Sequence, residues 1–379
     1  MAGGVDSPGA TDGRPLHVGW VVYGDLDRRS GGYLYDREVV DRLRAAGDEV
    51  TVVSLPERSY LRSVTHNASR RVRRRLRAVA GEVDVLVEDE LCHPSLAWVN
   101  DALPGDTPVV GLVHHLRSAE PHPPWRRRAY RAVERRYLRT LDAVVCNSET
   151  TRRTVADLAG PETTAESAVA HPAGSRFGEP LAPAEIRERA TAEPFRVVFL
   201  GNVTPRKGLN TLLDGLARLH CDWGLTVVGS LTADEAYAES VARRVGELGL
   251  TERVTLAGRV DDERLRAELR RGHVLAMPSA YEGFGIAYLE GMCFGLPALA
   301  SAAGGASELV THRTDGWLVD PTDASEVADA LAPVCRKRDR LARMGVAAAE
   351  RYREHPTWDE TAERVREFLA RVAATGPSP

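Results

Sequence analysis

Short apolar runs alternate with amphipathic helical segments along almost the entire chain. The apolar runs, for example Pro108–Val113 and Ala143–Cys146, are continuous and are not interrupted by alternating polar residues. Continuous Val, Ile and Leu runs are typical of parallel strands that helices cover on both faces. Strands that alternate with helices also favour parallel β-α-β units. The sequence therefore predicts an α/β fold built on parallel sheets.

Two series of such elements are predicted, separated by a stretch without clean periodicity. The strands of the first series are expected at Leu16–Tyr23, Glu49–Ser54, Val83–Val87, Pro108–Val113, Ala143–Cys146 and Ser167–His171. Those of the second series are expected at Phe195–Gly201, Leu225–Gly229, Val254–Ala257, Val274–Pro278, Pro297–Ser301 and Gly316–Val319. The chain closes with predicted helices over Ala324–Arg353 and Trp358–Ala373.

With 379 residues, the chain exceeds the size at which one core usually keeps growing. We expect two doubly wound domains over residues 15–176 and 195–356, joined by a linker over residues 177–194. The small, polar residues 1–14 are expected to form a disordered tail, and residues 357–373 a helix that packs back on the first domain. Two such domains facing each other would form a cleft at the carboxyl ends of their strands, where α/β proteins bind ligands.

The composition argues against several classes of protein. A net charge of −4 gives no global reason to expect a nucleic-acid partner. No stretch approaches the roughly 18 to 20 apolar residues that a spanning helix needs, and the first residues lack a signal-peptide core, so a cytoplasmic location is expected. The five cysteines never form a C-x-x-C pair and are predicted to be free thiols; they are Cys92, Cys146, Cys221, Cys293 and Cys335.

The strongest chemical motif surrounds Glu282 and Glu290. A predicted buried strand ends at Pro278, a glycine-rich turn follows, and a helix is expected to begin near Gly285. Glycines let backbone N–H groups approach a ligand closely, and a helix N-terminus favours an anion or polar oxygens. A carboxylate accepts several hydrogen bonds and is suited to holding hydroxyl groups. This context favours a sugar or ribose site over two unrelated surface glutamates.

A second motif, Gly201–Gly208, lies between a predicted strand and a predicted helix. It contains the adjacent cations Arg206 and Lys207, and Lys207 and Lys337 are the only lysines in the chain. Cations at a helix entry suit a diphosphate, and they stabilise a transition state in which a leaving diphosphate gains negative charge. Gly31 and Gly32 similarly follow the first strand and would allow a phosphate to approach the backbone.

These segments resemble glycosyltransferase family 4, the retaining transferases of the GT-B fold, in which two Rossmann-like domains face each other across a cleft. The similarity extends from about Leu16 to Trp358. Further residues fall where the pattern of this family places them, namely Gly304, Gly305, Glu308, the segment Asp315–Val319, Pro321 and Asp323. The resemblance implies the GT-B architecture for this chain.

The resemblance also implies roles for residues of the predicted second domain. Glu282 is expected to contact the hydroxyls of the donor sugar, and Glu290 the ribose of the nucleotide. Backbone N–H groups of Gly283, Phe284 and Gly285 are expected to line the sugar and phosphate pocket. Lys207 matches the lysine of the family.

Other matches to the family are weaker. Asn202 stands where the family commonly has arginine, so Arg206 is expected to substitute in holding the phosphate. The loop of Gly31 and Gly32 is expected to face the donor phosphate and the acceptor. His114, favoured over His115, is expected to contact the transferred sugar through its ring or backbone. Backbone groups at Arg259 and Val260 are expected to lie at the nucleobase.

Two arginine-rich helices leave an alternative open. In residues 70–77 and 125–139, apolar residues form one stripe and arginines cover the remaining faces. The simpler interpretation is a helix that covers a sheet with a solvated charged face. The other is attachment to an anionic membrane surface that carries the acceptor. For the second helix, Trp125 is expected to belong to the buried stripe.

The sequence thus predicts an enzyme that transfers a sugar from a nucleoside diphosphate sugar to a hydroxyl of a glycan, lipid-linked or small-molecule acceptor. The resemblance implies retention of the anomeric configuration. No cofactor or metal is expected to be required for this transfer. The alternatives are a GT-B epimerase or hydrolase of nucleotide sugars, and a non-catalytic binding protein. The expected location is cytoplasmic, with the inner face of the membrane as the alternative.

Overall fold

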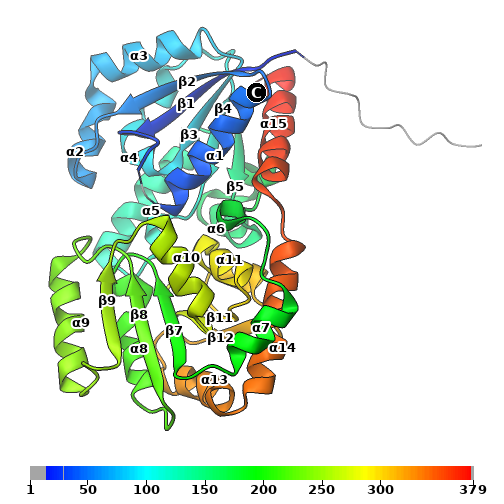
Figure 1. The fold of residues 1–379 in the computed structure, drawn as a ribbon. Coiled ribbons are helices and arrows are strands. Elements are labelled where there is room, and N and C mark those ends of the chain that lie inside the picture. The colour runs from blue at the N-terminus through cyan, green and yellow to red at the C-terminus, as the bar shows by residue number, and fades with distance from the viewer. Residues whose placement is uncertain (1–13, 29, 377–379) are drawn as a thin grey trace, which may run out of the picture.

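The computed structural model describes residues 14–28 and 30–376, in two α/β domains (Figure 1). The predicted disordered tail lies outside the described residues, except for Arg14. Each domain contains a six-stranded sheet in which all the pairs of neighbouring strands are parallel. The predicted fold class, with two domains of parallel α/β structure, is confirmed.

The N-terminal sheet has the strand order β2-β1-β3-β4-β5-β6. Its strands are β1 (His17–Tyr23), β2 (Glu49–Leu55), β3 (Val85–Asp89), β4 (Val109–Val113), β5 (Ala143–Cys146) and β6 (Ser167–Val169). Its helices are α1 (Gly31–Ala45), α2 (Tyr60–Val64), α3 (Arg70–Ala80), α4 (His93–Leu96), α5 (Pro124–Leu138) and α6 (Glu149–Ala159).

The C-terminal sheet has the order β12-β11-β10-β7-β8-β9. Its strands are β7 (Phe195–Leu200), β8 (Trp223–Val228), β9 (Val254–Gly258), β10 (Val274–Met277), β11 (Ala298–Ser301) and β12 (Gly316–Val319). The remaining helices are α7 (Pro183–Ala190), α8 (Leu209–Leu216), α9 (Glu235–Glu247), α10 (Asp262–Arg271), α11 (Ile286–Cys293), α12 (Ala306–Leu309), α13 (Ala324–Arg336), α14 (Arg338–Arg353) and α15 (Trp358–Thr375).

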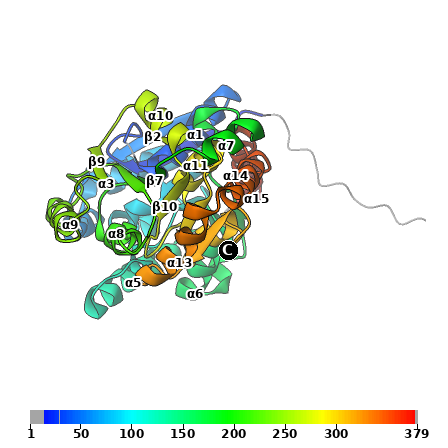
Figure 2. The same ribbon diagram turned by 60° about the horizontal axis from the view of Figure 1, so that its bottom comes forward.

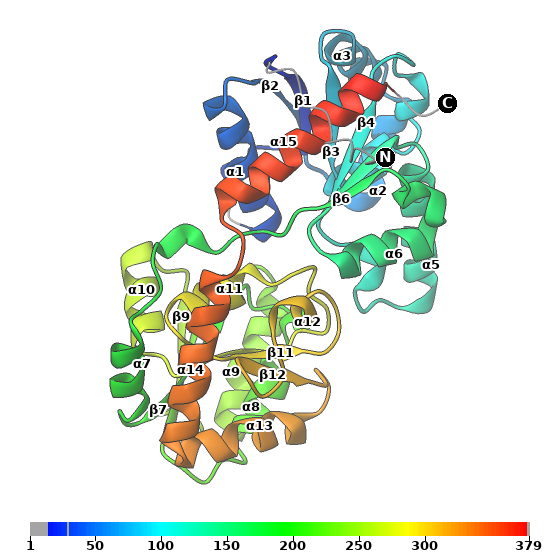
Figure 3. The same ribbon diagram turned by 90° about the vertical axis from the view of Figure 1, so that its right-hand side faces the viewer.

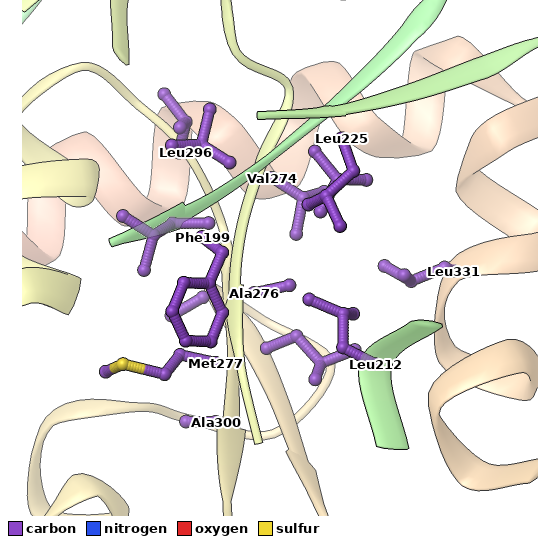
Figure 4. Close-up of a cluster of buried hydrophobic side chains, with 14 of the residues drawn as sticks. Phe199, Leu212, Leu225, Val274, Ala276, Met277, Leu296, Ala300 and Leu331 are labelled. Atoms are coloured by element: carbon purple, nitrogen blue, oxygen red, sulfur yellow. The ribbon is translucent and has the colours of Figure 1, made fainter. Parts of the chain in front are cut away.

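Helices lie on both faces of each sheet, as the continuous apolar strands require (Figures 1 and 2). The central strands β4, β5, β10 and β11 are buried along their whole length. In the C-terminal domain, Phe199, Val274 and Met277 of the sheet pack with helix residues such as Leu212 and Leu331 (Figure 4). These apolar layers hold the carboxyl ends of the strands, and the loops that follow them, in fixed positions.

The last helix, α15, returns to the N-terminal domain and lies beside α1 (Figure 3). Trp358 is buried there, and its ring contacts Tyr35 with 5.6 Å between ring centroids. Arg366 binds both oxygens of Asp48 at 2.7 and 2.8 Å. The chain therefore crosses between the domains twice, once before α7 and once between α14 and α15.

The structure corrects two details of the sequence analysis. The segment 324–353 is interrupted at Lys337, whose backbone dihedrals of −104° and 82° lie outside the helical region and separate α13 from α14. Cys221 and Cys335 form a disulfide, so the prediction of five free thiols is wrong. Gly215 of α8 lets this helix pack closely on Val327 of α13, which brings the two cysteines together.

Among the described helices, none combines the length and the apolarity that crossing a bilayer demands.

Candidate active site

The turn over residues 278–285 connects β10 to α11 and carries Glu282. Gly285 begins the helix with a positive φ of 107°, where a side chain would be strained. Glu282 pairs with Gly304 in an isolated bridge, and the N–H of Gly305 donates to the Glu282 carbonyl at 2.8 Å. A Cβ on Gly304 would lie 2.2 Å from that carbonyl oxygen. The two glycines after β11 therefore allow the 278–285 turn to adopt its position.

Glu282 is 7% exposed and forms an ion pair with the two predicted cations. Lys207 Nζ lies 2.6 Å from Glu282 Oε1, and Arg206 Nη1 lies 3.4 Å from the same oxygen. Burial raises the pKa of Glu282, but Lys207 and Arg206 more than reverse this effect and hold the pKa at about 2. Burial lowers the pKa of Lys207, and the carboxylate opposes that change. The Glu282 carboxylate is therefore ionised at neutral pH.

A line of charged groups continues from this pair into the N-terminal domain. Arg206 donates to the Tyr281 carbonyl at 2.7 Å, and its Nε lies 3.4 Å from Glu120 Oε1. The same carboxylate oxygen lies 3.1 Å from His115 Nε2. Although burial raises the pKa of Glu120, contact with His115 and Arg206 lowers it below its usual value. Residues of both domains thus surround the cations.

The loops after β4 and β5 meet the 278–285 turn from the other side. A Cβ on Gly283 would lie 2.2 Å from the His114 carbonyl oxygen, so only glycine fits there. Ser148 Oγ donates to the Gly283 carbonyl at 2.8 Å. The His114 ring is 8% exposed and lies against Gly32 and Tyr35. The backbone of His114, and not its ring, is therefore the part that faces the turn.

Buried carboxyl groups lie behind His114. Its backbone N–H donates to Glu90 Oε2 at 3.0 Å, and its Nε2 lies 3.7 Å from Asp36 Oδ1. Asp36, Asp89 and His114 place ligand atoms within 4.8 Å of one another, an arrangement that could hold a metal ion. Burial raises the pKa of Asp36 to about 7, and burial together with Asp36 raises that of Asp89 to about 8.

Glu290 lies in α11 and is 6% exposed. Its Oε1 lies 3.0 Å from Arg176 Nη1, and Arg176 also pairs with Asp262 at the start of α10. Burial raises the pKa of Glu290, and Arg176 opposes this shift. A guanidinium from the segment that crosses between the domains therefore supports a carboxylate of the C-terminal domain.

Other predicted residues lie around this centre without joining it. Asn202 accepts a hydrogen bond from the Ser230 N–H at 3.3 Å and links the loops after β7 and β8. Gly31 begins α1, and a Cβ there would lie 3.6 Å from Ile286 of α11. Arg259 is exposed directly after β9, and Val260 packs in part on the C-terminal core.

Phe284 contributes packing as well as backbone to the turn. Its ring lies 5.3 Å from His171 and 5.4 Å from His355, between centroids. These histidines belong to the two segments that cross between the domains. The turn is therefore anchored to both crossings.

Sequence reasoning missed several residues of this centre. Glu120 and Arg176 lie in irregular segments, where no periodicity drew attention to them. Asp89 and Glu90 had a usable signal, because they stand at the end of β3, where ligand-binding residues of α/β proteins gather. Asp36 had no such signal, since it lies within α1.

Two family models match the chain. The model "Glycosyltransferase Family 4" matches residues 31–166, and "Glycosyl transferases group 1" matches residues 184–351. Together they cover most of both domains and include Gly31, Lys207 and Glu282.

Curated relatives include glycosyltransferases of several bacteria. A GDP-mannose-dependent alpha-(1-6)-phosphatidylinositol monomannoside mannosyltransferase of Mycobacterium tuberculosis is 34% identical over 251 residues, which are 63% of this chain and 64% of that protein. The lipopolysaccharide core biosynthesis mannosyltransferase LpsB of Rhizobium meliloti is 31% identical over 54% of this chain and 58% of its own length. The chain thus spans less than two thirds of the length of these relatives.

Solved structures match over nearly the whole chain. Sucrose-phosphate synthase from Thermosynechococcus elongatus has a TM-score of 0.79 at 20% identity, with 95% of this chain and 100% of that chain covered. Anabaena HepE, solved with UDP and glucose, has a TM-score of 0.74 at 19% identity, with coverage of 94% and 100%. These likenesses establish the shared fold. The two family models show that this chain belongs to glycosyltransferase family 4, and the solved structures show that it has the GT-B fold.

Proposed function

We propose that this protein transfers a sugar from a nucleoside diphosphate sugar to a hydroxyl of a glycan or lipid-linked acceptor, with retention. The observation that carries this proposal is the cluster that Lys207 and Arg206 form with the buried Glu282 where the two domains meet. Its cations are suited to a leaving diphosphate, and its carboxylate is suited to sugar hydroxyls. The names of the relatives, which include GDP-mannose-dependent transferases, support a nucleotide sugar as donor.

In this proposal, Lys207 and Arg206 stabilise the diphosphate as the bond to the sugar breaks. Negative charge on the leaving group grows in the transition state, so fixed cations lower the barrier more than they stabilise the bound donor. Glu282 holds Lys207 in place before the donor arrives, at 2.6 Å. When the donor binds, the same carboxylate accepts hydrogen bonds from hydroxyls of the sugar.

We assign Glu290 to the ribose of the nucleotide. Arg176 lies beside the carboxylate and favours its charged form. A charged carboxylate accepts two or more hydrogen bonds, as a ribose diol requires. The His114 carbonyl and the backbone around Gly283, Phe284 and Gly285 would line the sugar between these two glutamates.

We propose that the acceptor is presented at an anionic membrane surface that the N-terminal domain contacts. Trp125, predicted to be buried, is 67% exposed at the start of α5, because the sheet-facing stripe of the helix begins only at Tyr130. Figure 2 shows α5 at the periphery of the molecule. Arg127 and Arg131 are also exposed there. An exposed indole among arginines suits the boundary between lipid headgroups and water.

The direct test is a donor screen with the purified protein and membrane lipid extract as acceptor. GDP-mannose is tested first, followed by other GDP- and UDP-sugars, each with and without EDTA. We expect transfer of radiolabelled sugar to a lipid or glycan from one donor, unaffected by EDTA. Release of free sugar without any glycosylated product would favour a hydrolase. Loss of transfer in EDTA that is restored by a metal would contradict the expectation that the transfer requires no metal ion.

A further inference from the structure

Glu308 of the C-terminal domain binds the N-terminus of a helix in the other domain. Its Oε1 accepts hydrogen bonds from the N–H and the hydroxyl of Thr150, both at 2.6 Å. Its Oε2 accepts one from the N–H of Glu149 at 2.9 Å. Both donors belong to the first turn of α6, which faces α12 between the domains in Figure 3. A carboxylate of one domain thus caps a helix of the other.

The same carboxylate contacts the first segment that crosses between the domains. His171 Nε2 lies 3.3 Å from Glu308 Oε2. His171 is in turn held by α15, because Thr361 Oγ1 donates to its carbonyl at 2.7 Å. The second crossing lies beside it, since His355 Nε2 is 2.9 Å from the Pro172 carbonyl. Glu308 therefore joins α6 to the crossings about which the domains would move.

Electrostatics favours this contact. The first N–H groups of a helix have no partner within the helix, and the positive end of the helix dipole attracts an anion. Burial raises the pKa of Glu308, but contact with His171 and with Thr150 outweighs burial and holds the pKa at about 2. The carboxylate remains charged throughout the neutral range.

The backbone of α12 transmits this contact to the proposed donor site. Glu308 lies three residues after Gly305, whose N–H binds the Glu282 carbonyl at 2.8 Å. Arg351 Nη2 donates to the Glu308 carbonyl at 2.7 Å and fixes α12 on its own domain. Ser148, which caps α6, donates to the Gly283 carbonyl at 2.8 Å. Gly305 of the C-terminal domain and Ser148 of the N-terminal domain therefore bind the neighbouring carbonyls of Glu282 and Gly283 in the 278–285 turn.

We propose that Glu308 is a positioning residue that holds the two domains in the arrangement in which the 278–285 turn meets the N-terminal domain. It acts through α6 and the 278–285 turn, without touching the sugar or the nucleotide. Its kinetic consequence rests on the proposed function, whereas its effect on domain arrangement does not. This distinction separates a failure of the present inference from a failure of the proposed activity.

The test variant is Glu308→Gln, which removes the charge and leaves only one acceptor oxygen for four donor contacts. The matched control is Glu326→Gln, because Glu326 also accepts from a backbone N–H, that of Asp320 at 2.7 Å, but within one domain. Small-angle scattering of the unliganded proteins should show a larger radius of gyration for Glu308→Gln only. Transfer should show a kcat about tenfold lower, in the usual range of couplings between sites, with unchanged affinity for GDP and UDP.

Thr150→Val provides a second variant that leaves Glu308 intact but removes its hydroxyl donor. It should expand the molecule in the same direction, and its effect should not add fully to that of Glu308→Gln. If Glu308→Gln does not fold, Thr150→Val alone decides the question through its scattering. Unchanged scattering in the folded variants would overturn the inference. A parallel loss of nucleotide affinity and kcat would also overturn it, because Glu308 would then act at the donor.

Discussion

Replacement of Lys207 by alanine should destabilise the protein as well as slow its reaction. In the native protein Glu282 is 7% exposed, and the variant leaves Arg206, at 3.4 Å, as its remaining cation. Removing one partner of a buried ion pair typically costs about 3–5 kcal/mol. Because Arg206 still compensates part of the charge, we expect the lower end, about 3 kcal/mol. For a domain of this size, that free energy corresponds to a fall in Tm of about 6–12 °C.

Differential scanning calorimetry of the two proteins measures this effect, and the double variant Lys207→Met, Glu282→Gln is the control. Replacing both partners removes the uncompensated charge, so most of the lost stability should return. Activity should not return, because the double variant still lacks the cation. Restored stability without restored activity would separate the structural role of the pair from its catalytic role.

For turnover, we expect Lys207→Ala to lower kcat by about 10² or more, the scale seen when one group that stabilises developing charge is lost. The measurement is the rate of sugar transfer at saturating donor, made at a temperature where the variant is folded. A folded Lys207→Ala protein with near-normal kcat would refute the phosphate role. An unchanged Tm would refute the electrostatic reasoning about Glu282.

Three further predictions follow from the same contacts. Asn202→Arg should keep donor KM and kcat unchanged, since the family resemblance implies arginine at this position; loss of donor binding in a titration would show a specialised role for Asn202. Replacing Arg127, Arg131 and Arg135 with Gln should weaken binding to anionic vesicles by roughly 10²-fold, at about 1 kcal/mol per arginine; flotation insensitive to these changes and to salt would contradict electrostatic attachment. The folded protein lowers the pKa of Glu308 from its usual 4.5 to about 2, so the Glu308 contacts stabilise the protein above pH 4.5, and this stabilisation is lost as the pH falls toward 2. The Tm difference between wild type and Glu308→Gln should therefore shrink below pH 4.5. A difference that stays constant with pH would contradict this linkage.

The architecture was predictable because the spacing of apolar residues and the length of each apolar run identify the strands and helices. Continuous apolar runs such as Ala143–Cys146 identified buried parallel strands, and the predicted strand is the observed β5. Glycine-rich turns directly after strands located Glu282 and Lys207 at the ends of β10 and β7. Local sequence contains this information, because each run and each turn is specified by neighbouring residues.

Pairings between distant segments could not be read from the sequence. The disulfide joins Cys221 and Cys335, 114 residues apart, through the packing of α8 on α13. The partner of Glu290 is Arg176, 114 residues away, in a segment without regular periodicity. The exposure of Trp125 likewise depends on where α5 first meets the domain, because helical spacing alone places this residue in the stripe.

The central claim is that Glu290 holds the nucleotide and Glu282 holds the sugar that moves. Isothermal titration of Glu282→Ala and Glu290→Ala with the bare nucleoside diphosphate, GDP or UDP, tests it most directly. We predict that Glu290→Ala loses nucleotide affinity, whereas Glu282→Ala keeps it but has a strongly reduced kcat, because the sugar interaction strengthens only in the transition state. Loss of nucleotide binding in Glu282→Ala with normal binding in Glu290→Ala would reverse the orientation of the donor. Normal binding and normal turnover in both variants would place the active site elsewhere.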